Sequence, residues 1–301
     1  MNYEDVITGQ GIEKKFKNFE LNIPELHIPK GFSTALIGEN GAGKTTLLNI
    51  LAGIRRDSKG DIRYFEQKQN IEDALVKERI GFTGTKNFFM GYWNGDQVKE
   101  MMSMLFDSFD ADKFDGICRS LNIDSTIFGK RGKSVSKLSD GNRMKLMLAT
   151  VFARNTDILI LDEPASPLDP LMRDMLGDMI RAYLAEGDGL RSVVFSTHNV
   201  SDMENVTDYI IIIDDGKILE EGFVTDLKEK YILVKGERED LAAAEQHLIT
   251  CQSNSFGFEG VALTDNMNKF AGMDVEFDTP NLFNISVAVM KQNSKLTMPV
   301  L

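Results

Sequence analysis

Residues 38–46 read Gly-Glu-Asn-Gly-Ala-Gly-Lys-Thr-Thr and fit the phosphate-loop pattern G-x-x-x-x-G-K-[ST]. The apolar stretch 34–37 before them predicts a buried strand, and 46–52 has the spacing of a helix. Glycines let the backbone curl so that its N–H groups and the helix N-terminus face an anion. The sequence therefore predicts a nucleoside triphosphate site formed by Gly38, Asn40, Gly41, Gly43, Lys44, Thr45 and Thr46.

Two further motifs follow apolar strands and supply catalytic groups. Residues 158–161 are Ile-Leu-Ile-Leu and lead into Asp162 and Glu163. Ligands of doubly wound sheets bind at the carboxyl ends of the strands, so both carboxylates are expected beside the phosphate loop. We predict that Thr45 and Asp162 hold Mg²⁺ and that Lys44 reaches the β- and γ-phosphates. Glu163 is the predicted general base, and His198, which ends the next apolar strand, orients the attacking water.

The composition restricts the compartment and the partners. The chain has 301 residues, of which 42% are hydrophobic, and its net charge of −12 argues against nucleic acid as a partner. Cys118 and Cys251 share no metal-like spacing and are expected to be free thiols in a reducing compartment. No signal peptide or apolar run of ~20 residues is visible, so we expect a cytoplasmic chain unless another protein holds it at a membrane.

The hydrophobic pattern predicts an α/β fold with several parts. Residues 1–30 alternate as in an antiparallel β-layer, and about 86–148 has the spacing of an inserted helical subdomain. Apolar runs at 158–161, 192–196 and 209–213, with helical spacing between the first two, predict a covered parallel sheet. Beyond about residue 230 the pattern weakens, and 231–234 and 283–289 are interpreted as strands.

In this order of motifs the chain resembles the ATP-binding subunits of ABC transporters over residues 1–227. Lys-Leu-Ser-Asp-Gly-Asn at 137–142 stands where that family has its signature motif, and Ser-Pro-Leu-Asp at 166–169 stands where it has the D-loop. The resemblance implies a P-loop NTPase fold with a mixed sheet and an accessory C-terminal extension, 228–301. It also implies that Phe16 stacks on adenine, and that Ser139 and Gly141 complete the ATP site of a facing copy in a homodimer or heterodimer.

The motifs depart from the family pattern at three places. Asp140 adds a negative charge to the signature, so it either points away from the nucleotide or weakens closure of the dimer. Pro167 stiffens the D-loop. Thr85 occupies the slot of the family's glutamine loop, from which its shorter hydroxyl would contact Mg²⁺ only through water.

The aromatic stretch 88–93 lies where the family receives a helix of a membrane permease. Its rings either anchor that helix, with Trp93 as the expected exposed anchor, or pack the helical subdomain onto the sheet. The variant signature and the altered glutamine-loop slot look most like Gram-positive exporters of antimicrobial or amphipathic peptides, such as phenol-soluble modulin exporters. The resemblance thus implies an ATPase subunit on the inner face of the cell membrane. The alternatives are a subunit of an importer and a soluble ABC ATPase.

Overall fold

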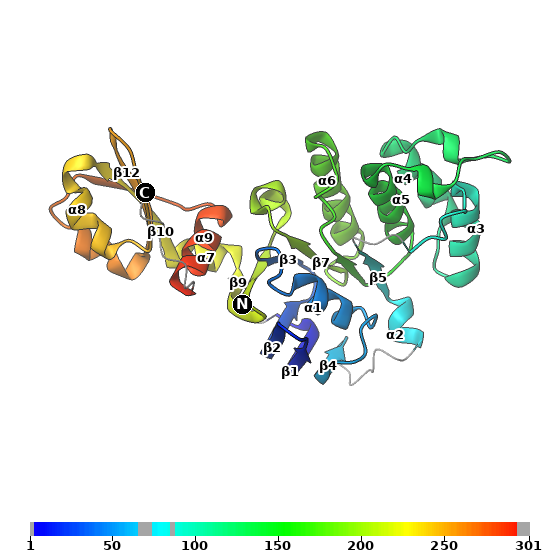
Figure 1. Ribbon diagram of the computed structural model, residues 1–301, viewed down its shortest axis with the longest axis horizontal. Helices are drawn as coiled ribbons and strands as arrows, with labels where there is room; N and C mark the ends of the chain where they lie inside the picture. The colour runs from blue at the N-terminus through cyan, green and yellow to red at the C-terminus, as the bar shows by residue number, and fades with distance from the viewer. Residues whose placement is uncertain (1–2, 66–73, 85–87, 294–301) are drawn as a thin grey trace.

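The computed structural model describes residues 3–65, 74–84 and 88–293, and its strands form three β-sheets. Figure 1 shows the C-terminal elements at one end of the molecule. At the opposite end lie three helices, α3 (Gly95–Leu105), α4 (Ala111–Ser120) and α5 (Asp140–Phe152). The central sheet lies between these two ends.

The central sheet has six strands in the order β5-β6-β7-β3-β8-β9, and only the pair β8–β9 is antiparallel. Its strands are β3 (Ser33–Ile37), β5 (Ile80–Thr83), β6 (Ile158–Leu161), β7 (Ser192–Thr197), β8 (Tyr209–Asp214) and β9 (Lys217–Phe223). Alternate residues of β6 join different core clusters, Leu159 and Leu161 on one face and Ile158 and Ile160 on the other. Both faces are therefore buried, which explains why the parallel strands are apolar without interruption.

Helices cover both faces of this sheet. Leu47 and Leu48 of helix α1 (Lys44–Leu51) join the cluster on one face, together with Val76 of α2 (Ala74–Glu78). Leu176 and Ile180 of helix α6 (Pro170–Glu186) pack on the other face, in the same cluster as residues of α5. Helix α6 begins at a proline, which suits the first turn because its missing N–H would have no partner there.

A three-stranded antiparallel sheet lies beside α1, in the order β2-β1-β4. Its strands are β1 (Asp5–Lys15), β2 (Glu20–Pro29) and β4 (Lys59–Tyr64). The predicted antiparallel layer at the start of the chain is thereby confirmed. The hairpin that joins β1 to β2 carries Phe16, and this turn lies next to the phosphate loop.

The turn between β8 and β9 ties the two sheets to the phosphate loop. Gly216 has φ +73, and a Cβ there would lie 2.0 Å from the carbonyl oxygen of Glu20. Its N–H donates to the Ala42 carbonyl at 3.0 Å, and its own carbonyl accepts from Asn22 N–H at 2.8 Å. Only glycine allows so close an approach, so this position fixes how the loop sits on β2.

The C-terminal part of the chain forms a separate four-stranded antiparallel sheet, in the order β11-β12-β10-β13. Its strands are β10 (Tyr231–Glu237), β11 (Thr250–Ser253), β12 (Gly257–Leu263) and β13 (Val275–Asp278). The helices beside it are α7 (Val224–Lys230), α8 (Leu241–Ala244) and α9 (Leu282–Asn293), with short 3-10 turns η5 (Arg238–Asp240), η6 (Glu245–His247) and η7 (Thr264–Phe270).

The prediction of a strand at 283–289 is wrong, because this stretch lies within helix α9. Its buried residues Leu282, Ile285, Ala288 and Val289 recur every three or four positions and therefore share one helical face. That face packs into the main core cluster, so burial outweighs the strand preference of the valines and isoleucine. The expected strand at 231–234 is present as the first half of β10.

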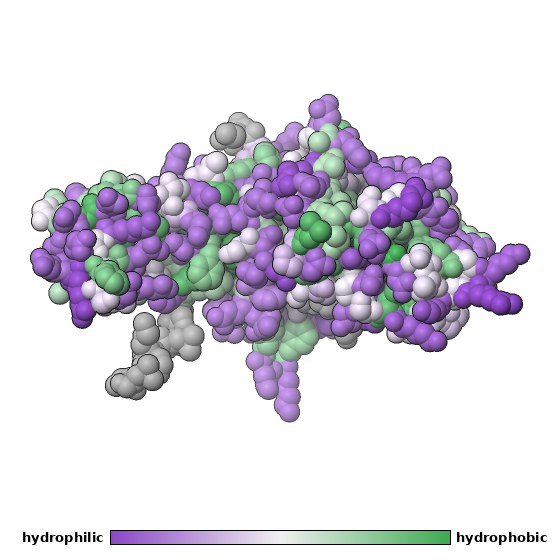
Figure 2. Space-filling model, turned by 90° about the horizontal axis from the view of Figure 1, so that it is seen from above, coloured by the Kyte–Doolittle hydropathy of each residue, from purple (hydrophilic) through white to green (hydrophobic). Residues whose placement is uncertain are grey.

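The surface is largely hydrophilic on the face that Figure 2 shows. Within the described residues, no helix is both long enough and apolar enough to cross a membrane. Exposed aromatic and methionine side chains occur at Phe88, Met90 and Tyr92, in the loop that leads to α3. Trp93 is instead partly buried against the core, so the prediction that it is the exposed anchor is wrong.

Candidate functional site

The phosphate loop connects β3 to α1 and is shaped by two glycines with positive φ, Gly41 at 93° and Gly43 at 111°. A Cβ on Gly43 would lie 2.9 Å from the ring of Phe19. Lys44 is the first residue of α1 and only 6% exposed. Its ammonium donates to the Gly38 carbonyl at 2.7 Å and to the Glu39 carbonyl at 3.2 Å, which holds the charge inside the loop.

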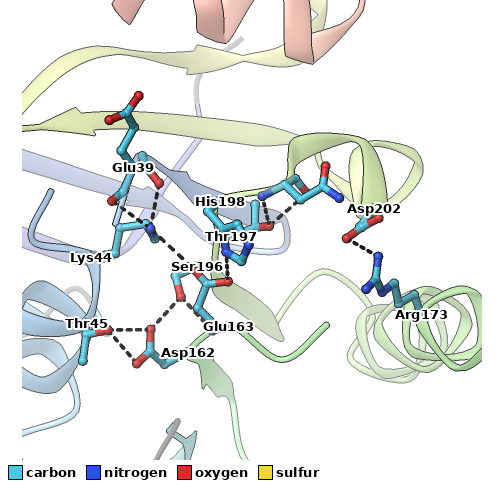
Figure 3. A network of polar contacts seen from close by, with 12 residues as sticks. Glu39, Lys44, Thr45, Asp162, Glu163, Arg173, Ser196, Thr197, His198 and Asp202 are labelled. Atoms are coloured by element: carbon cyan, nitrogen blue, oxygen red, sulfur yellow. Dashed lines mark hydrogen bonds and ion pairs between the residues drawn. The ribbon is translucent and has the colours of Figure 1, made fainter. Parts of the chain in front are cut away.

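The two acidic residues after β6 have different partners (Figure 3). Asp162 is buried and accepts from the Thr45 hydroxyl at 2.8 Å and from the Ser196 hydroxyl at 2.7 Å. Glu163 lies between Lys44 and His198, with one carboxylate oxygen 3.3 Å from Lys44 Nζ and the other 2.7 Å from His198 Nδ1. Its backbone has φ 50, an uncommon value for a residue with a side chain.

Ser196, the fifth residue of β7, fixes that backbone turn. Its hydroxyl accepts from the Glu163 N–H at 2.8 Å while donating to Asp162. Strands β6 and β7 pair in parallel with Leu161 beside Phe195, so the residues that follow them meet at one edge. The parallel sheet therefore brings Asp162, Glu163 and His198 together, although the first and the last are 36 positions apart in the sequence.

A cavity of about 690 Å³ joins the phosphate loop to the β1–β2 turn, and its size is that of a small-molecule site. Its lining consists of Phe16, Lys17, Asn18, Phe19, Glu39, Asn40, Gly41, Gly43, Lys44, Thr45, Thr46 and Glu163. Phe16 is 40% exposed, and the centroid of its ring lies 5.1 Å from the Arg55 guanidinium carbon and 5.4 Å from Lys14 Nζ. The cavity thus offers an aromatic surface at one end and a buried cation at the other.

The residues of the predicted signature motif are not among the described residues that line this cavity. Ser139 caps the N-terminus of α5 and accepts from the Asn142 N–H at 3.3 Å. Asp140 is paired with Arg143 at 2.8 Å, and its side chain is 83% exposed. A Cβ on Gly141 would lie 2.9 Å from the Pro167 carbonyl, so the signature touches the D-loop of its own chain.

A family model described as "ABC transporter" matches residues 21–166, which include the phosphate loop, the signature and Asp162–Glu163. The chain contains an ABC transporter ATP-binding domain.

Curated relatives share this domain but carry different names. The energy-coupling factor transporter ATP-binding protein EcfA1 of Staphylococcus saprophyticus is 28% identical over 73% of this chain and 82% of its own length. The daunorubicin/doxorubicin resistance ATP-binding protein DrrA of Streptomyces peucetius is 29% identical over 68% of this chain. The sulfate/thiosulfate import ATP-binding protein CysA of Bacillus cereus is 31% identical over 73%. This chain covers 61% of DrrA and 62% of CysA.

Solved structures confirm the predicted fold. The ATP-binding subunit of an ABC transporter superposes with a TM-score of 0.64 at 19% identity and covers 74% of this chain and 92% of its own. A dimeric ATP-binding cassette in a post-hydrolysis state, bound to ADP and Pi, gives 0.62 at 19% identity over 72% and 98%. The ATP-binding domain therefore has the P-loop α/β fold with its antiparallel and helical parts. The sequence match to residues 21–166 gives its family, that of the ATP-hydrolysing domains of ABC transporters.

The sequence prediction missed two residues of the ATP-binding domain, and one residue that it named lies outside the described residues. Thr85 lies in the short gap between 84 and 88, so its predicted contact with Mg²⁺ has no structural account. The role of Ser196 was missed, although a serine just before His198 on an apolar strand is the available signal. Arg173 was missed because Asp202 is far from it in the sequence and because a backbone carbonyl, such as that of Leu168, has no sequence signal.

Proposed function

We propose that the chain is the ATP-hydrolysing subunit of an ABC transporter and that Glu163 is the general base. The observation that carries this proposal is the position of Glu163, between Lys44 and His198 and next to the Thr45–Asp162 pair. A carboxylate there can accept a proton from water that attacks the γ-phosphorus. His198 orients the water and the phosphate, and Lys44 stabilises the charge on the phosphate oxygens.

The oxygen atoms of Thr45 and Asp162 fit Mg²⁺. Asp162 is buried, and its carboxylate already faces the Thr45 hydroxyl at 2.8 Å. Mg²⁺ prefers hard oxygen ligands and commonly takes one or two from the protein, with phosphate oxygens and waters as the rest. When bound, Mg²⁺ neutralises charge on the β- and γ-phosphates.

The adenine of ATP would stack on Phe16. The Phe16 ring belongs to the same cavity as the phosphate loop, and its exposed face leaves room for a base. Arg55 and Lys14 lie near the ring, and Asp57 pairs with both. These contacts limit the rotation of Phe16 and prepare it for stacking.

Two copies of the chain would close on ATP head to tail. Ser139 is exposed at the N-terminus of a 13-residue helix, and its own chain does not use it in the cavity. The hydroxyl of Ser139, the Gly141 N–H and the helix dipole can therefore bind the phosphates held by a facing copy. The neighbour of the same fold that is bound to ADP and Pi is dimeric, which supports the dimer but leaves its arrangement part of this proposal.

Removing the charge of Asp140 should strengthen this closure modestly. The ion pair with Arg143 neutralises Asp140 only partly, since the carboxylate is 83% exposed. In a Glu163→Gln background we expect Asp140→Asn to lower the ATP concentration needed for dimerisation by about 2- to 5-fold, the scale of an exposed charge. Analytical ultracentrifugation across an ATP series measures this.

The matched control is Asp178→Asn, which breaks a similar i,i+3 pair with Arg181 on α6. It should leave the ATP dependence of dimerisation unchanged. If Asp140→Asn behaves like the control, Asp140 lies too far from the facing phosphates to matter. The same conclusion would follow if both variants lowered the ATP concentration needed for dimerisation by the same amount and if high salt reduced both effects equally.

The permease would dock on the loop before α3. Phe88, Met90 and Tyr92 expose apolar side chains there, whereas Phe89 and Trp93 pack inward. The inward rings fit the interpretation that this stretch packs the helical subdomain onto the core. The outward side chains fit the interpretation that it anchors a permease helix. The chain would then be cytoplasmic and bound to the inner face of the membrane through the permease.

Co-purification tests this docking. Tagged protein from mildly solubilised membranes of the source cells should recover a multi-span membrane protein, and Tyr92→Ser should reduce the recovery several-fold. Phe256→Ser is the control, because Phe256 is 84% exposed on the distant β11–β12 turn. Recovery without any membrane protein, under conditions where the tagged chain hydrolyses ATP, would favour a soluble ATPase.

We place the ATP-binding domain at 1–227, with a helical subdomain at about 86–148 and an accessory extension at 228–301.

The cargo we propose is an amphipathic peptide that is exported, on the strength of the variant signature at 137–142. The names of the relatives favour neither direction, since they include an import protein and a drug-resistance protein. Stimulation of the recovered complex by an amphipathic helical peptide, and not by sulfate, is the expected result; the reverse would reject peptide export.

A further inference from the structure

The segment that follows His198 is held from several sides. It contains two short 3-10 turns, η3 (Val200–Asp202) and η4 (Glu204–Val206). Val200, Met203 and Val206 are buried in the main core cluster, so the segment has little freedom to move by itself. In the chain, His198 lies between β7 and this segment, so both bear on the position of its backbone. We call residues 199–206 the switch segment.

One side of the switch segment is tied to the D-loop by Arg173, whose contact with Asp202 is drawn in Figure 3. The Arg173 guanidinium donates to Asp202 at 2.7 Å through Nη1 and to the Leu168 carbonyl at 2.9 Å through Nε. Leu168 belongs to the D-loop, and its neighbour Asp169 caps helix α6. A single planar cation therefore fixes the spacing of the two loops that flank Glu163.

The other side of the switch segment is tied to the C-terminal elements by Glu204. Its Oε1 accepts from Lys228 Nζ of α7 at 3.2 Å and from the Leu282 N–H at the start of α9 at 3.2 Å. The carboxylate thus sits at the N-terminus of α9, where the helix dipole favours negative charge. These donors lie 24 and 78 positions further along the chain, so both hydrogen bonds of Glu204 are tertiary contacts.

Helix α9 also completes the core beneath the switch segment. Leu282, Ile285, Ala288 and Val289 are buried in the same cluster as Val200, Met203 and Val206. The helix contacts η3 directly as well as β8 and β9 of the central sheet. The apolar contacts supply the stability of this packing, and the polar contacts of Glu204 supply its orientation.

We propose that α7 and α9 position the switch segment, and through it His198, with Glu204 as the positioning residue. The inference rests on the proposed role of His198 in ATP hydrolysis. The inference gives the C-terminal elements a role. They hold the switch segment from one side while Arg173 holds it from the other, and together they set its distance from Glu163. A partner or ligand that moved α7 or α9 would then change hydrolysis without touching the nucleotide.

Two lysines on the same helix allow a matched test. Lys228 pairs with Glu204, and Lys230 pairs with Glu220 of β9 at 2.5 Å, away from the switch segment. We expect Lys228→Met and Glu204→Ala to lower kcat about 3- to 10-fold while the KM for ATP changes less than about 2-fold, because a misplaced catalytic group slows the step without weakening binding. Lys230→Met should retain the wild-type kcat.

Hydrogen exchange and a conservative variant separate positioning from general stability. Peptides that cover 195–206 should exchange faster in Lys228→Met than in Lys230→Met, whereas phosphate-loop peptides should not differ. Glu204→Gln keeps an oxygen for the Leu282 N–H and should recover part of the kcat lost in Glu204→Ala. Should Glu204→Ala not fold, Lys228→Met gives the answer alone, since its side chain is 32% exposed.

The outcomes distinguish this inference from the proposed function. If His198→Gln lowers kcat but Lys228→Met matches Lys230→Met in rate and exchange, the positioning role is wrong and the proposed function stands. If His198→Gln leaves kcat unchanged, the proposed role of His198 is wrong and the inference falls with it. A rise in KM as large as the fall in kcat in Lys228→Met would also overturn positioning.

Discussion

Glu163→Gln is expected to lower ATP turnover by about 10²- to 10⁴-fold, the usual contribution of a positioned general base. The substitution keeps the shape of the side chain and its contact with His198 but removes the proton acceptor. ATP should still bind, with equal or slightly higher affinity, because the carboxylate 3.3 Å from Lys44 Nζ no longer competes with phosphate for that cation. Because hydrolysis is blocked, ATP should hold two copies together, and the dimer should be visible by size-exclusion chromatography.

The steady-state phosphate release rate and a fluorescent-nucleotide titration measure these two effects separately. Glu186→Gln is the control, because Glu186 is a half-exposed carboxylate at the end of α6, paired with Lys113 and Arg191 and remote from the cavity. If the turnover of Glu163→Gln stays within about 10-fold of the wild-type turnover, Glu163 is not the general base. A monomer at saturating ATP would contradict the head-to-tail dimer while leaving the general base in place.

The phosphate loop and the residues after β6 could be predicted because their chemistry is encoded locally. Glycines with positive φ, a lysine at the first helical position and a threonine next to it must occur at fixed spacing for the loop to surround phosphate. The approach of His198 to Glu163 could also be predicted, since the carboxyl ends of neighbouring parallel strands meet. A short-range pattern determines the geometry of the loop, and the pairing of two neighbouring parallel strands determines the approach of His198 to Glu163.

The contacts that tertiary packing decides could not be predicted. The stretch 283–289 is rich in β-branched residues, yet it is helical because its apolar face fits the core and Asn281 accepts from the Asn284 N–H at 2.8 Å. The sequence does contain Pro280 and Asn281 just before this helix, a start signal that the apolar run outweighed. Trp93 was expected outside because of its residue type, but exposure depends on the side of the loop that faces the core.

The contacts of Glu204 and Arg173 show a second limit of the sequence. Each is one charged side chain among the 80 Asp, Glu, Lys and Arg residues of this chain, and each meets a partner from another part of the fold. No motif spacing marks such pairs, because the distance between the partners is set by the sheet order and the helix packing. A surface charge that positions a catalytic loop is therefore visible only in three dimensions.

Lys44→Ala is expected to weaken ATP binding by about 100-fold, or about 3 kcal/mol, since charge-assisted hydrogen bonds to phosphate are lost from a buried cation. Lys44 is 6% exposed, so solvent does not screen it as it would a surface lysine. Turnover should fall as well, because Glu163 also loses the cation that lies 3.3 Å from it. Titration with a fluorescent ATP analogue gives the affinity.

Lys17→Ala provides the comparison that makes this result specific. Lys17 lines the same cavity and carries the same charge, but it is exposed. Its removal should weaken binding only about 2- to 5-fold and less at high salt, as for other exposed charges, whereas the effect of Lys44→Ala should persist. Thermal unfolding without nucleotide checks that Lys44→Ala remains folded. Equal losses in the two variants would mean that phosphate binds at the rim of the cavity, and the loop would then not be the phosphate site.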